Sequence, residues 1–271
     1  MKMIERTSST VHYILHQYWI DFQDPRTKDF FLVDISPFTF AMIMASYVLF
    51  VKWIGPNLMK NREPMDLRLV MFVYNTAMVI INTYFFVMVV LHCDYGKRFI
   101  DFKYPDRKDN SPRALWELSQ GWYYFMSKFL DLFDTVLFVL RKKTSHITFL
   151  HLYHHTCVPL FGWLFLKHNA VMPATGLFAL INSFIHIIMY SYYALSTLGP
   201  NIRPYLWWKR YITLAQLAQF AFGIFYGIIM FFLQTGYPVF WTYFGLTQPF
   251  FFFYLFYDFY RNSYSSKTKQ N

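Results

Sequence analysis

The chain alternates long hydrophobic runs with short polar connections. An α-helix needs about 20 mostly apolar residues to cross a bilayer, and seven runs reach that length. The connections contain Pro, Gly and charged residues, which end helices. The pattern predicts an all-α polytopic membrane protein with seven transmembrane helices in a single domain, residues 1–271, ending in a tail from about residue 262. The expected spans cover roughly residues 35–54, 68–92, 115–140, 146–166, 171–195, 209–233 and 237–258.

The composition agrees with a membrane protein and narrows its chemistry. Of the 271 residues, 56% are hydrophobic and 23% are aromatic, which exceeds what a soluble domain of this size needs. Cys93 and Cys157 are the only cysteines, so a disulfide framework and a cysteine-based zinc site are excluded. The N-terminal stretch lacks the apolar core and the small-residue cleavage site of a removable signal peptide, so we expect no cleaved leader.

The net charge of +10 raises the question of a nucleic-acid partner. The basic residues lie in short loops between hydrophobic runs, which is typical of membrane topology and of binding to anionic ligands at the membrane surface. We therefore expect no nucleic acid. A cytosolic C-terminus places most of the basic loops on the cytosolic side. The loop of residues 97–113 contradicts this orientation, because it carries six Lys or Arg residues.

The C-terminal sequence KTKQN bears on the compartment. Lys267 and Lys269 stand fifth and third from the end. This is the spacing of the lysine signal by which cytosolic coats return proteins to the endoplasmic reticulum. The sequence therefore predicts a multi-pass protein of the endoplasmic reticulum membrane with its C-terminus in the cytosol. A solvated basic tail is the alternative interpretation.

Four of the hydrophobic runs carry polar residues at helical spacing. An ionisable residue at mid-bilayer costs about 2.5–3.5 kcal/mol, so three in one span would cost roughly 9 kcal/mol if they faced lipid. We expect the four polar stripes to line one cavity. Structural roles are the alternative: an internal ion pair, hydrogen bonds between helices, or a buried core histidine. The stripes comprise Lys128, Asp131, Asp134 and Thr135; His151, His154 and His155; Asn182, His186, Met189 and Tyr193; and Thr213, Gln216 and Gln219.

These stripes carry a family resemblance. The stretches KFLDLFDT, HLYHH, NSFIHIIMYSYY and TLAQLAQ resemble the four signature boxes of the very-long-chain fatty acid elongase family, in that family's order and spacing. The stretch GPNLMKNREPMDLRLVMFVYN also resembles its N-terminal pattern, and the similarity covers roughly residues 21–261. The HxxHH pattern alone is weakly specific, since desaturases share it. Asp131 departs from the family, because many members have Glu at this position.

The resemblance implies an acyltransferase, a very-long-chain 3-oxoacyl-CoA synthase. Such an enzyme condenses a long-chain acyl-CoA with malonyl-CoA and yields 3-ketoacyl-CoA, carbon dioxide and CoA. The implied architecture is a helical bundle around a substrate tunnel in membrane lipid, with no cofactor beyond the co-substrate malonyl-CoA. The chain carries no nucleotide-redox fingerprint. The reaction therefore implies functional association with a ketoreductase, a dehydratase and an enoyl reductase in the same membrane.

The resemblance also assigns roles to particular residues. His154, the middle histidine of the box, is implied to take the acyl group, and a neutral imidazole is nucleophilic near pH 7. His186 is implied to assist decarboxylation or to stabilise the enolate. His151 and His155 are implied to orient neighbours or to shuttle protons. The remaining implied residues either fix this array (Lys128, Asp131 and Asp134) or supply hydrogen bonds (Asn182, Tyr190, Gln216 and Gln219).

Basic residues at the ends of the expected spans are candidates for binding the CoA phosphates. Arginine offers bidentate contacts to phosphate, and lysine offers a point charge. Charge that sets the membrane topology explains the same residues equally well. The candidates are Arg141, Lys142, Lys143, Lys209, Arg210 and Arg261.

Three alternatives to the acyl-histidine scheme stay open. Cys157 follows His154 by three residues, and a Cys–His pair is an effective nucleophile, although a small buried thiol also explains it. A membrane di-iron desaturase or hydroxylase shares the HxxHH pattern, but four histidines in the expected interior are too few to ligate two irons, so we expect no metal. A non-enzymatic seven-span transporter or receptor would use the buried polar groups as an ion or proton relay.

Overall fold

The computed structural model describes residues 12–168, 173–236 and 239–265. The chain divides into two compact units, unit 1 with residues 1–65 and 105–171 and unit 2 with residues 66–104 and 172–271. It passes from one unit to the other at residues 65–66, 104–105 and 171–172, so neither unit is a continuous segment. Within the described residues, every regular secondary-structure element is a helix. The β pairing there is a single isolated bridge between Lys103 and Thr235. The all-α prediction is confirmed.

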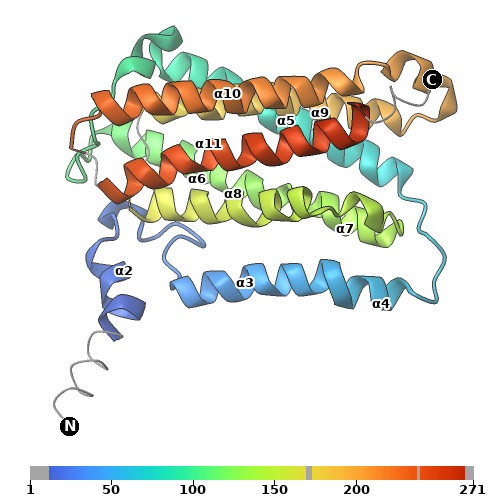
Figure 1. Ribbon diagram of the computed structural model, residues 1–271. Coiled ribbons are helices and arrows are strands. Elements are labelled where there is room, and N and C mark those ends of the chain that lie inside the picture. The colour runs from blue at the N-terminus through green and yellow to red at the C-terminus, as the bar shows by residue number, and fades with distance from the viewer. Residues whose placement is uncertain (1–11, 169–172, 237–238, 266–271) are drawn as a thin grey trace. The chain divides into compact units, whose positions relative to one another are not determined.

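Helix starts in unit 1 follow from local sequence. Ser36 caps α3 by accepting a hydrogen bond from the Thr39 amide, and a proline occupies the first helical position, where its missing N–H costs nothing. Ser111 begins α6 in the same way, with a proline next to it. In unit 1, α6 and α8 pack together and α3 lies against α8 (Figure 1). The helices are α2 (Tyr18–Asp21), α3 (Pro37–Leu49), α4 (Gly55–Met59), α6 (Pro112–Leu130), α7 (Phe133–Leu140) and α8 (Phe149–Lys167), with 3₁₀ or π turns at Tyr13–Gln17, Pro25–Thr27, Phe50–Ile54 and Thr144–His146.

The expected span over residues 115–140 consists of two helices. α6 ends at Leu130 and α7 begins at Phe133. Across the junction, the Leu132 amide bonds to the Phe129 carbonyl and the Thr135 amide bonds to the Leu132 carbonyl, each at 3.2 Å. These three-residue steps are tighter than those of an α-helix. The junction therefore overwinds the chain in the middle of a polar stripe.

An aromatic cluster forms the core of unit 1. The rings of Phe40 on α3 and Trp163 on α8 stack with centroids 5.1 Å apart. Phe125 on α6 belongs to the same cluster and is 1% exposed. Gly162 permits this packing, because a Cβ added there would lie 2.8 Å from the Phe125 ring. The absence of a side chain at one position thus sets how closely α8 approaches α6.

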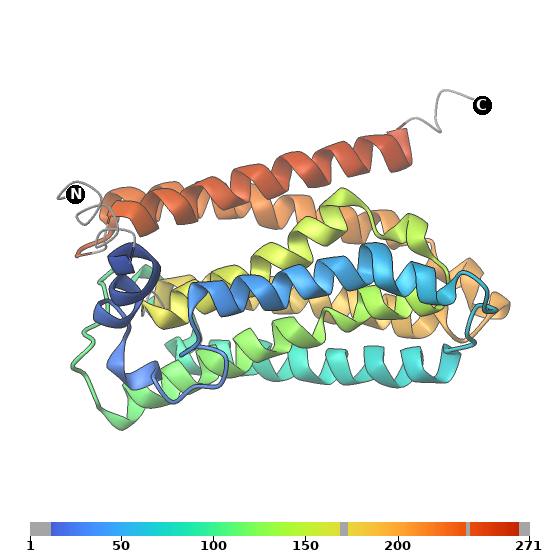
Figure 2. The ribbon, with the colours of Figure 1, turned by 90° about the horizontal axis from the view of Figure 1, so that it is seen from below.

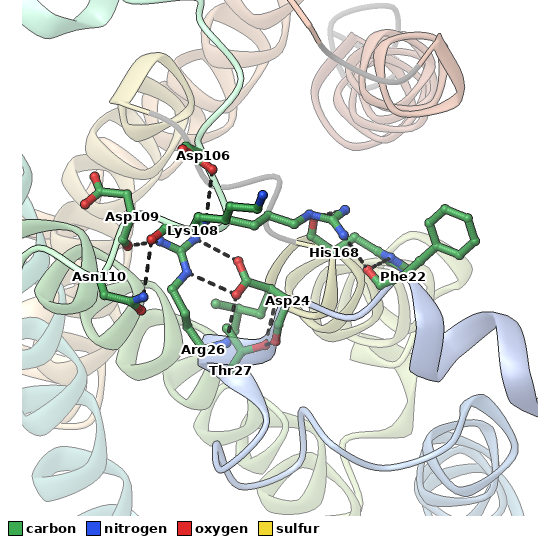
Figure 3. A network of polar contacts seen from close by, with 11 residues as sticks. Phe22, Asp24, Arg26, Thr27, Asp106, Lys108, Asp109, Asn110 and His168 are labelled. Carbon is green, nitrogen blue, oxygen red and sulfur yellow. Dashed lines mark hydrogen bonds and ion pairs between the residues drawn. The ribbon is translucent and has the colours of Figure 1, made fainter.

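A polar network ties the segment before α3 to the end of α8 (Figure 3). The buried Asp24 pairs with Arg26 at 2.8 Å, and Arg26 also donates to the Asp109 carbonyl. Arg107 donates to two carbonyls, those of Phe22 (2.9 Å) and His168 (3.1 Å). These guanidinium bonds join segments that lie 61 to 85 residues apart in the chain.

Lys167 extends this tie. Its ammonium group, 2% exposed, donates to the Gln23 side chain at 3.1 Å and to the carbonyls of Val33 (3.0 Å) and Ile35 (3.2 Å). An ammonium group has three donors, and all three are used here. The last residue of α8 therefore holds the segment that leads into α3.

Unit 2 is built from four long helices. α5 packs along α9, and α10 packs along α11, which Figure 2 shows in orange and red. The Tyr226 hydroxyl on α10 donates to the carbonyls of Phe99 and Ala174, which lie after α5 and before α9. The helices are α5 (Arg68–His92), α9 (Gly176–Ser196), α10 (Lys209–Leu233) and α11 (Val239–Tyr260), with short 3₁₀ or π segments at Asp94–Ile100, Pro173–Thr175, Pro200–Leu206 and Arg261–Ser265.

Four helical segments are long and apolar enough to cross a membrane. They correspond to the first, second, fifth and sixth expected spans, and they make the chain a multi-pass membrane protein. The spans expected at 115–140, 146–166 and 237–258 fall on α6–α7, α8 and α11 and stay predictions. Lys267 and Lys269 lie outside the described residues. The four segments are Pro37–Met59, Arg68–His92, Pro173–Ser196 and Lys209–Leu233.

The close approach at Gly162 gives a stability prediction. Gly162→Ala should lower the free energy of unfolding by about 1–3 kcal/mol, because the new methyl group forces the buried Phe125 ring to move. Gly245→Ala is the control, since an added Cβ there meets nothing within 4 Å and alanine is the better helix former. Apparent melting temperatures in detergent measure both. A Gly162→Ala protein that melts at or above the wild-type temperature contradicts this packing.

The network at the end of α8 gives a pH prediction. Burial, reinforced by the positive charges of Arg107 and Lys167, lowers the pKa of His168 from 6.5 to about 4. The unfolded chain therefore takes up a proton below pH 6.5 that the folded chain refuses, so the His168 contribution to stability is present above pH 6.5 and is lost as the pH falls toward 4. His168→Asn should shrink the fall in melting temperature between pH 7 and pH 5. An equal fall in His168→Asn and in the wild-type protein contradicts the assignment.

Candidate active site

The residues that the sequence marks as a site divide between the two units. Unit 1 contains the histidine box on α8, the acidic and basic residues around the α6–α7 junction, and the basic turn after α7. Unit 2 contains the other two polar stripes, which lie on α9 and α10. In unit 1 these residues are Lys128, Asp131, Asp134, Arg141, Lys142, Lys143, His151, His154 and His155; in unit 2 they are Asn182, His186, Tyr190, Lys209, Arg210, Gln216, Gln219 and Arg261.

The histidine box occupies the first two turns of α8. Thr148 caps this helix by accepting a hydrogen bond from the His151 amide at 3.2 Å, which fixes where the box begins. The rings of His151 and His155 lie 4.2 Å apart, centroid to centroid, as expected for positions one helical turn apart. The His154 ring is turned nearly perpendicular to that of His155, at 5.3 Å. The three imidazoles therefore form one contiguous cluster.

A buried ion pair stands at the α6–α7 junction. Lys128 Nζ lies 3.1 Å from Asp131 Oδ2, and both side chains are 3% exposed. The ammonium group also lies 4.7 Å from the centre of the Tyr124 ring, a cation–π contact. The internal ion pair that the sequence offered as the structural alternative is thus present. The pair can also have a second role, because both of its charges interact electrostatically with His154.

The ion pair and the histidine box belong to one electrostatic environment. Both the Asp131 carboxylate and the Lys128 ammonium group interact electrostatically with the His154 ring. The shorter aspartate at this position therefore still reaches the neighbourhood of the box. Asp134, one turn further on and half-buried, interacts electrostatically with Tyr47 of α3 instead.

A hydroxyl chain joins the box to α3. Tyr47 Oη donates to Thr135 Oγ1 at 2.7 Å, and Thr135 Oγ1 lies 2.8 Å from His151 Nε2. Thr135 is fully buried on α7. The spacing of the α6–α7 stripe picks out Thr135, but sequence analysis missed Tyr47. The signal was weak, since Tyr47 is one of 22 tyrosines in the chain.

Cys157 has hydroxyl neighbours. The half-buried thiol neighbours the Tyr153 and Thr156 side chains. Its role as an alternative nucleophile stays a prediction.

The basic turn after α7 comprises residues 141–143, and one of its lysines is held by a backbone carbonyl. Lys142 adopts a left-handed conformation, with φ of 54°, and its Nζ donates to the Lys60 carbonyl at 3.1 Å. Lys143 is exposed and Arg141 is half-buried. In unit 2, Lys209 and Arg210 begin α10 as expected, and both are exposed, as is Arg261. These cations are accessible to an anionic ligand.

In unit 2, His186 and Tyr190 lie on α9, and Gln216 and Gln219 lie on α10. The buried His186 ring lies 5.7 Å from that of Tyr190, and the Tyr190 ring lies 6.2 Å from that of Tyr74 on α5. Gln216 donates to the Met189 sulfur at 3.9 Å. Asn182 and Gln219 are half-buried.

Sequence analysis also missed two asparagines on α5. Asn75 is 2% exposed and Asn82 is 1% exposed, although both belong to a membrane-spanning helix. Their spacing of seven residues, in register with the buried Met78 and Phe85, would have identified a fifth polar stripe.

Among residues 12–168, 173–236 and 239–265, no group of three His, Cys, Asp or Glu side chains is arranged to hold a metal ion. The expectation of a metal-free site stays a prediction.

The fold and the residues of unit 1 define a multi-pass helical membrane protein with a histidine cluster beside a buried ion pair. The ELO family profile, described as the GNS1/SUR4 family, matches residues 32–271. Very long chain fatty acid elongase 7 of Rattus norvegicus is 39% identical over 249 residues, which cover 89% of this chain and 85% of the relative. Very long chain fatty acid elongase 1 of Homo sapiens is 41% identical over 212 residues, 76% of this chain and 73% of the relative. The protein belongs to the very-long-chain fatty acid elongase family.

The buried ion pair yields a prediction about stability. Lys128→Met leaves the Asp131 carboxylate buried without its cation, so the free energy of unfolding should fall by about 3–5 kcal/mol. The double variant Lys128→Met with Asp131→Leu should recover much of that loss, because no charge is left unpaired. Arg113→Met is the control: it removes an exposed ion pair with Glu117, which contributes about 0–1 kcal/mol. A double variant less stable than Lys128→Met contradicts the pairing.

Proposed function

We propose that the protein is a very-long-chain fatty acid elongase that condenses a long-chain acyl-CoA with malonyl-CoA through an acyl-histidine intermediate. The observation that carries the proposal is the grouping, within unit 1, of three contiguous imidazoles with the Lys128–Asp131 ion pair. Membership of the elongase family supplies the class of substrate. The proposed scheme uses no metal and no cofactor beyond the co-substrate malonyl-CoA.

In the first half-reaction, a ring nitrogen of neutral His154 attacks the thioester carbonyl. The carbon–sulfur bond breaks, the acyl group stays on the ring, and CoA leaves as the thiol after taking the imidazole proton. An acyl-imidazole is reactive enough to pass its acyl group on. We assign the attack to His154, the middle histidine of the box, whose ring interacts electrostatically with both members of the buried pair.

In the second half-reaction, malonyl-CoA loses carbon dioxide and the resulting enolate attacks the acyl carbonyl. The carbon–nitrogen bond to His154 breaks and the leaving ring nitrogen takes up one proton from solvent, which restores the neutral imidazole and yields 3-ketoacyl-CoA. We assign His186 to the decarboxylation or to stabilisation of the enolate. The exposed cations Lys143, Lys209 and Arg210 are assigned to the phosphates of CoA.

The rest of the proposal concerns the setting of the reaction. It places seven spans in the endoplasmic reticulum membrane, with a cytosolic C-terminus whose Lys267 and Lys269 act as a retrieval signal. The seven spans are proposed to form a bundle that encloses the acyl chain. Reduction of the ketone, dehydration and the second reduction are left to separate enzymes in the same membrane.

The decisive experiment separates the two half-reactions. Purified protein mixed with a long-chain acyl-CoA alone should release about one equivalent of CoA and carry the acyl group on a peptide containing residues 151–157, as expected for a covalent intermediate. His154→Ala should lose both the CoA release and the adduct. His186→Ala should keep both and fail to condense after malonyl-CoA is added. Thiol titration and mass spectrometry measure these outcomes on monodisperse protein.

Cys157→Ser is the matched control for the rival nucleophile. It should leave the CoA release and the adduct largely intact. Loss of the adduct in Cys157→Ser together with its retention in His154→Ala would transfer the role to the thiol. Wild-type protein that releases no CoA without malonyl-CoA rules out the covalent scheme.

A further inference from the structure

We propose that Tyr47 and Thr135 are positioning residues that fix the tautomer of His151, so that its ring proton resides on Nδ1. The proposal rests on the proposed function only for its catalytic consequence. Its structural content is a chain of two hydroxyl groups that ends on a single ring nitrogen of the histidine box.

The chain runs through three helices of unit 1. Tyr47 lies in the last turn of α3, Thr135 in the first turn of α7, and His151 in the first turn of α8. The two contacts measure 2.7 Å from Tyr47 Oη to Thr135 Oγ1 and 2.8 Å from Thr135 Oγ1 to His151 Nε2. Both distances are within the range of well-formed hydrogen bonds.

The direction of donation follows from counting hydrogens. The geometry of the first contact makes the Tyr47 phenol the donor. The Thr135 hydroxyl then has one hydrogen left to donate, and the partners identified for it among the described residues are Tyr47 and His151. Since Thr135 is fully buried, a hydrogen that bonded to nothing would cost about 1–3 kcal/mol. The arrangement that uses both hydrogens has Tyr47 donating to Thr135 and Thr135 donating to His151 Nε2.

A nitrogen that accepts a hydrogen bond from a hydroxyl group carries no proton in the neutral ring. The proton of His151 therefore lies on Nδ1. The backbone of His151 is held as well, because the Thr148 hydroxyl caps its amide. With both the backbone and Nε2 fixed, the ring keeps its orientation 4.2 Å from the His155 ring.

For catalysis, the consequence is that the ring proton of His151 has a fixed position in the histidine cluster. His151 then donates its proton through Nδ1. Nε2 takes no part in proton transfer, because it accepts the hydrogen bond of Thr135. Removing the Thr135 hydroxyl releases Nε2, so the proton distributes over both ring nitrogens. Because a misplaced proton affects the chemical step more than ground-state binding, kcat should respond more than KM.

The test is nitrogen NMR of protein labelled with ¹⁵N-histidine in lipid nanodiscs, where the two ring nitrogens of a neutral imidazole resonate far apart. The signals of His151 are assigned by their loss in His151→Gln. In wild-type protein they should report a proton on Nδ1. Thr135→Val should move the proton partly or wholly to Nε2, and Thr135→Ser should restore the wild-type signals. Tyr47→Phe should give an intermediate mixture, because the Thr135 hydroxyl then rotates freely.

Steady-state kinetics supply the second readout. Thr135→Val should lower kcat roughly 10–100-fold with KM changed less than about threefold, and Thr135→Ser should recover most of kcat. Thr83→Val is the matched control. Its hydroxyl bonds to the Val79 carbonyl on α5 of the other unit, so both readouts should stay at wild-type values.

Two results overturn the proposal: a proton on Nε2 of His151 in the wild-type protein, or unchanged His151 signals in Thr135→Val. Neither involves a substrate, so both stand apart from the outcome for acyl transfer. If wild-type protein forms no acyl-enzyme while the tautomer responds as described, the covalent scheme fails and the hydroxyl chain remains.

Discussion

The cost of placing charge in a low-dielectric interior is the constraint on which the rest of unit 1 depends. Lys128 and Asp131 lie three residues apart, both 3% exposed, and neither could be buried alone without a penalty of several kcal/mol. The overwound junction between α6 and α7 begins at Asp131, within reach of the Lys128 ammonium group. Local backbone geometry and charge pairing therefore support each other. Both members of the pair also interact electrostatically with the His154 ring.

The same constraint organises the neutral polar groups. A buried hydroxyl or imidazole in a membrane helix needs a partner, and in unit 1 the partners come from different helices. Tyr47, Thr135 and His151 satisfy one another across α3, α7 and α8. At the far end of α8, Lys167 satisfies carbonyls of the segment that leads into α3. The histidine box thus lies on a helix that is held at both ends, which suits a site that must keep several imidazoles in register.

Much of this arrangement could be predicted from the sequence, for identifiable reasons. Hydrophobic runs located the long helices, and the Ser–Pro pairs at Ser36 and Ser111 are local start signals that need no tertiary context. The i, i+3 spacing of Lys128 and Asp131 indicated an internal ion pair as the structural alternative, and that pair is present. Tyr47 was missed because its partner is 88 residues away in the chain and a tyrosine in an aromatic-rich span carries no distinguishing pattern. The contacts of Arg107 could not be predicted either, because its partners are backbone carbonyls, which every residue has.

The central claim is that acyl transfer takes place at the histidine cluster beside the buried ion pair. A cryo-electron microscopy structure with a non-cleavable thioether analogue of a long-chain acyl-CoA tests this most directly. The account predicts that the thioether sulfur and the adjoining carbon lie within about 3–3.5 Å of a ring nitrogen of His154, the distance of a reactive approach. A sulfur held against the Cys157 thiol, or bound away from the imidazoles of α8 altogether, would contradict the account.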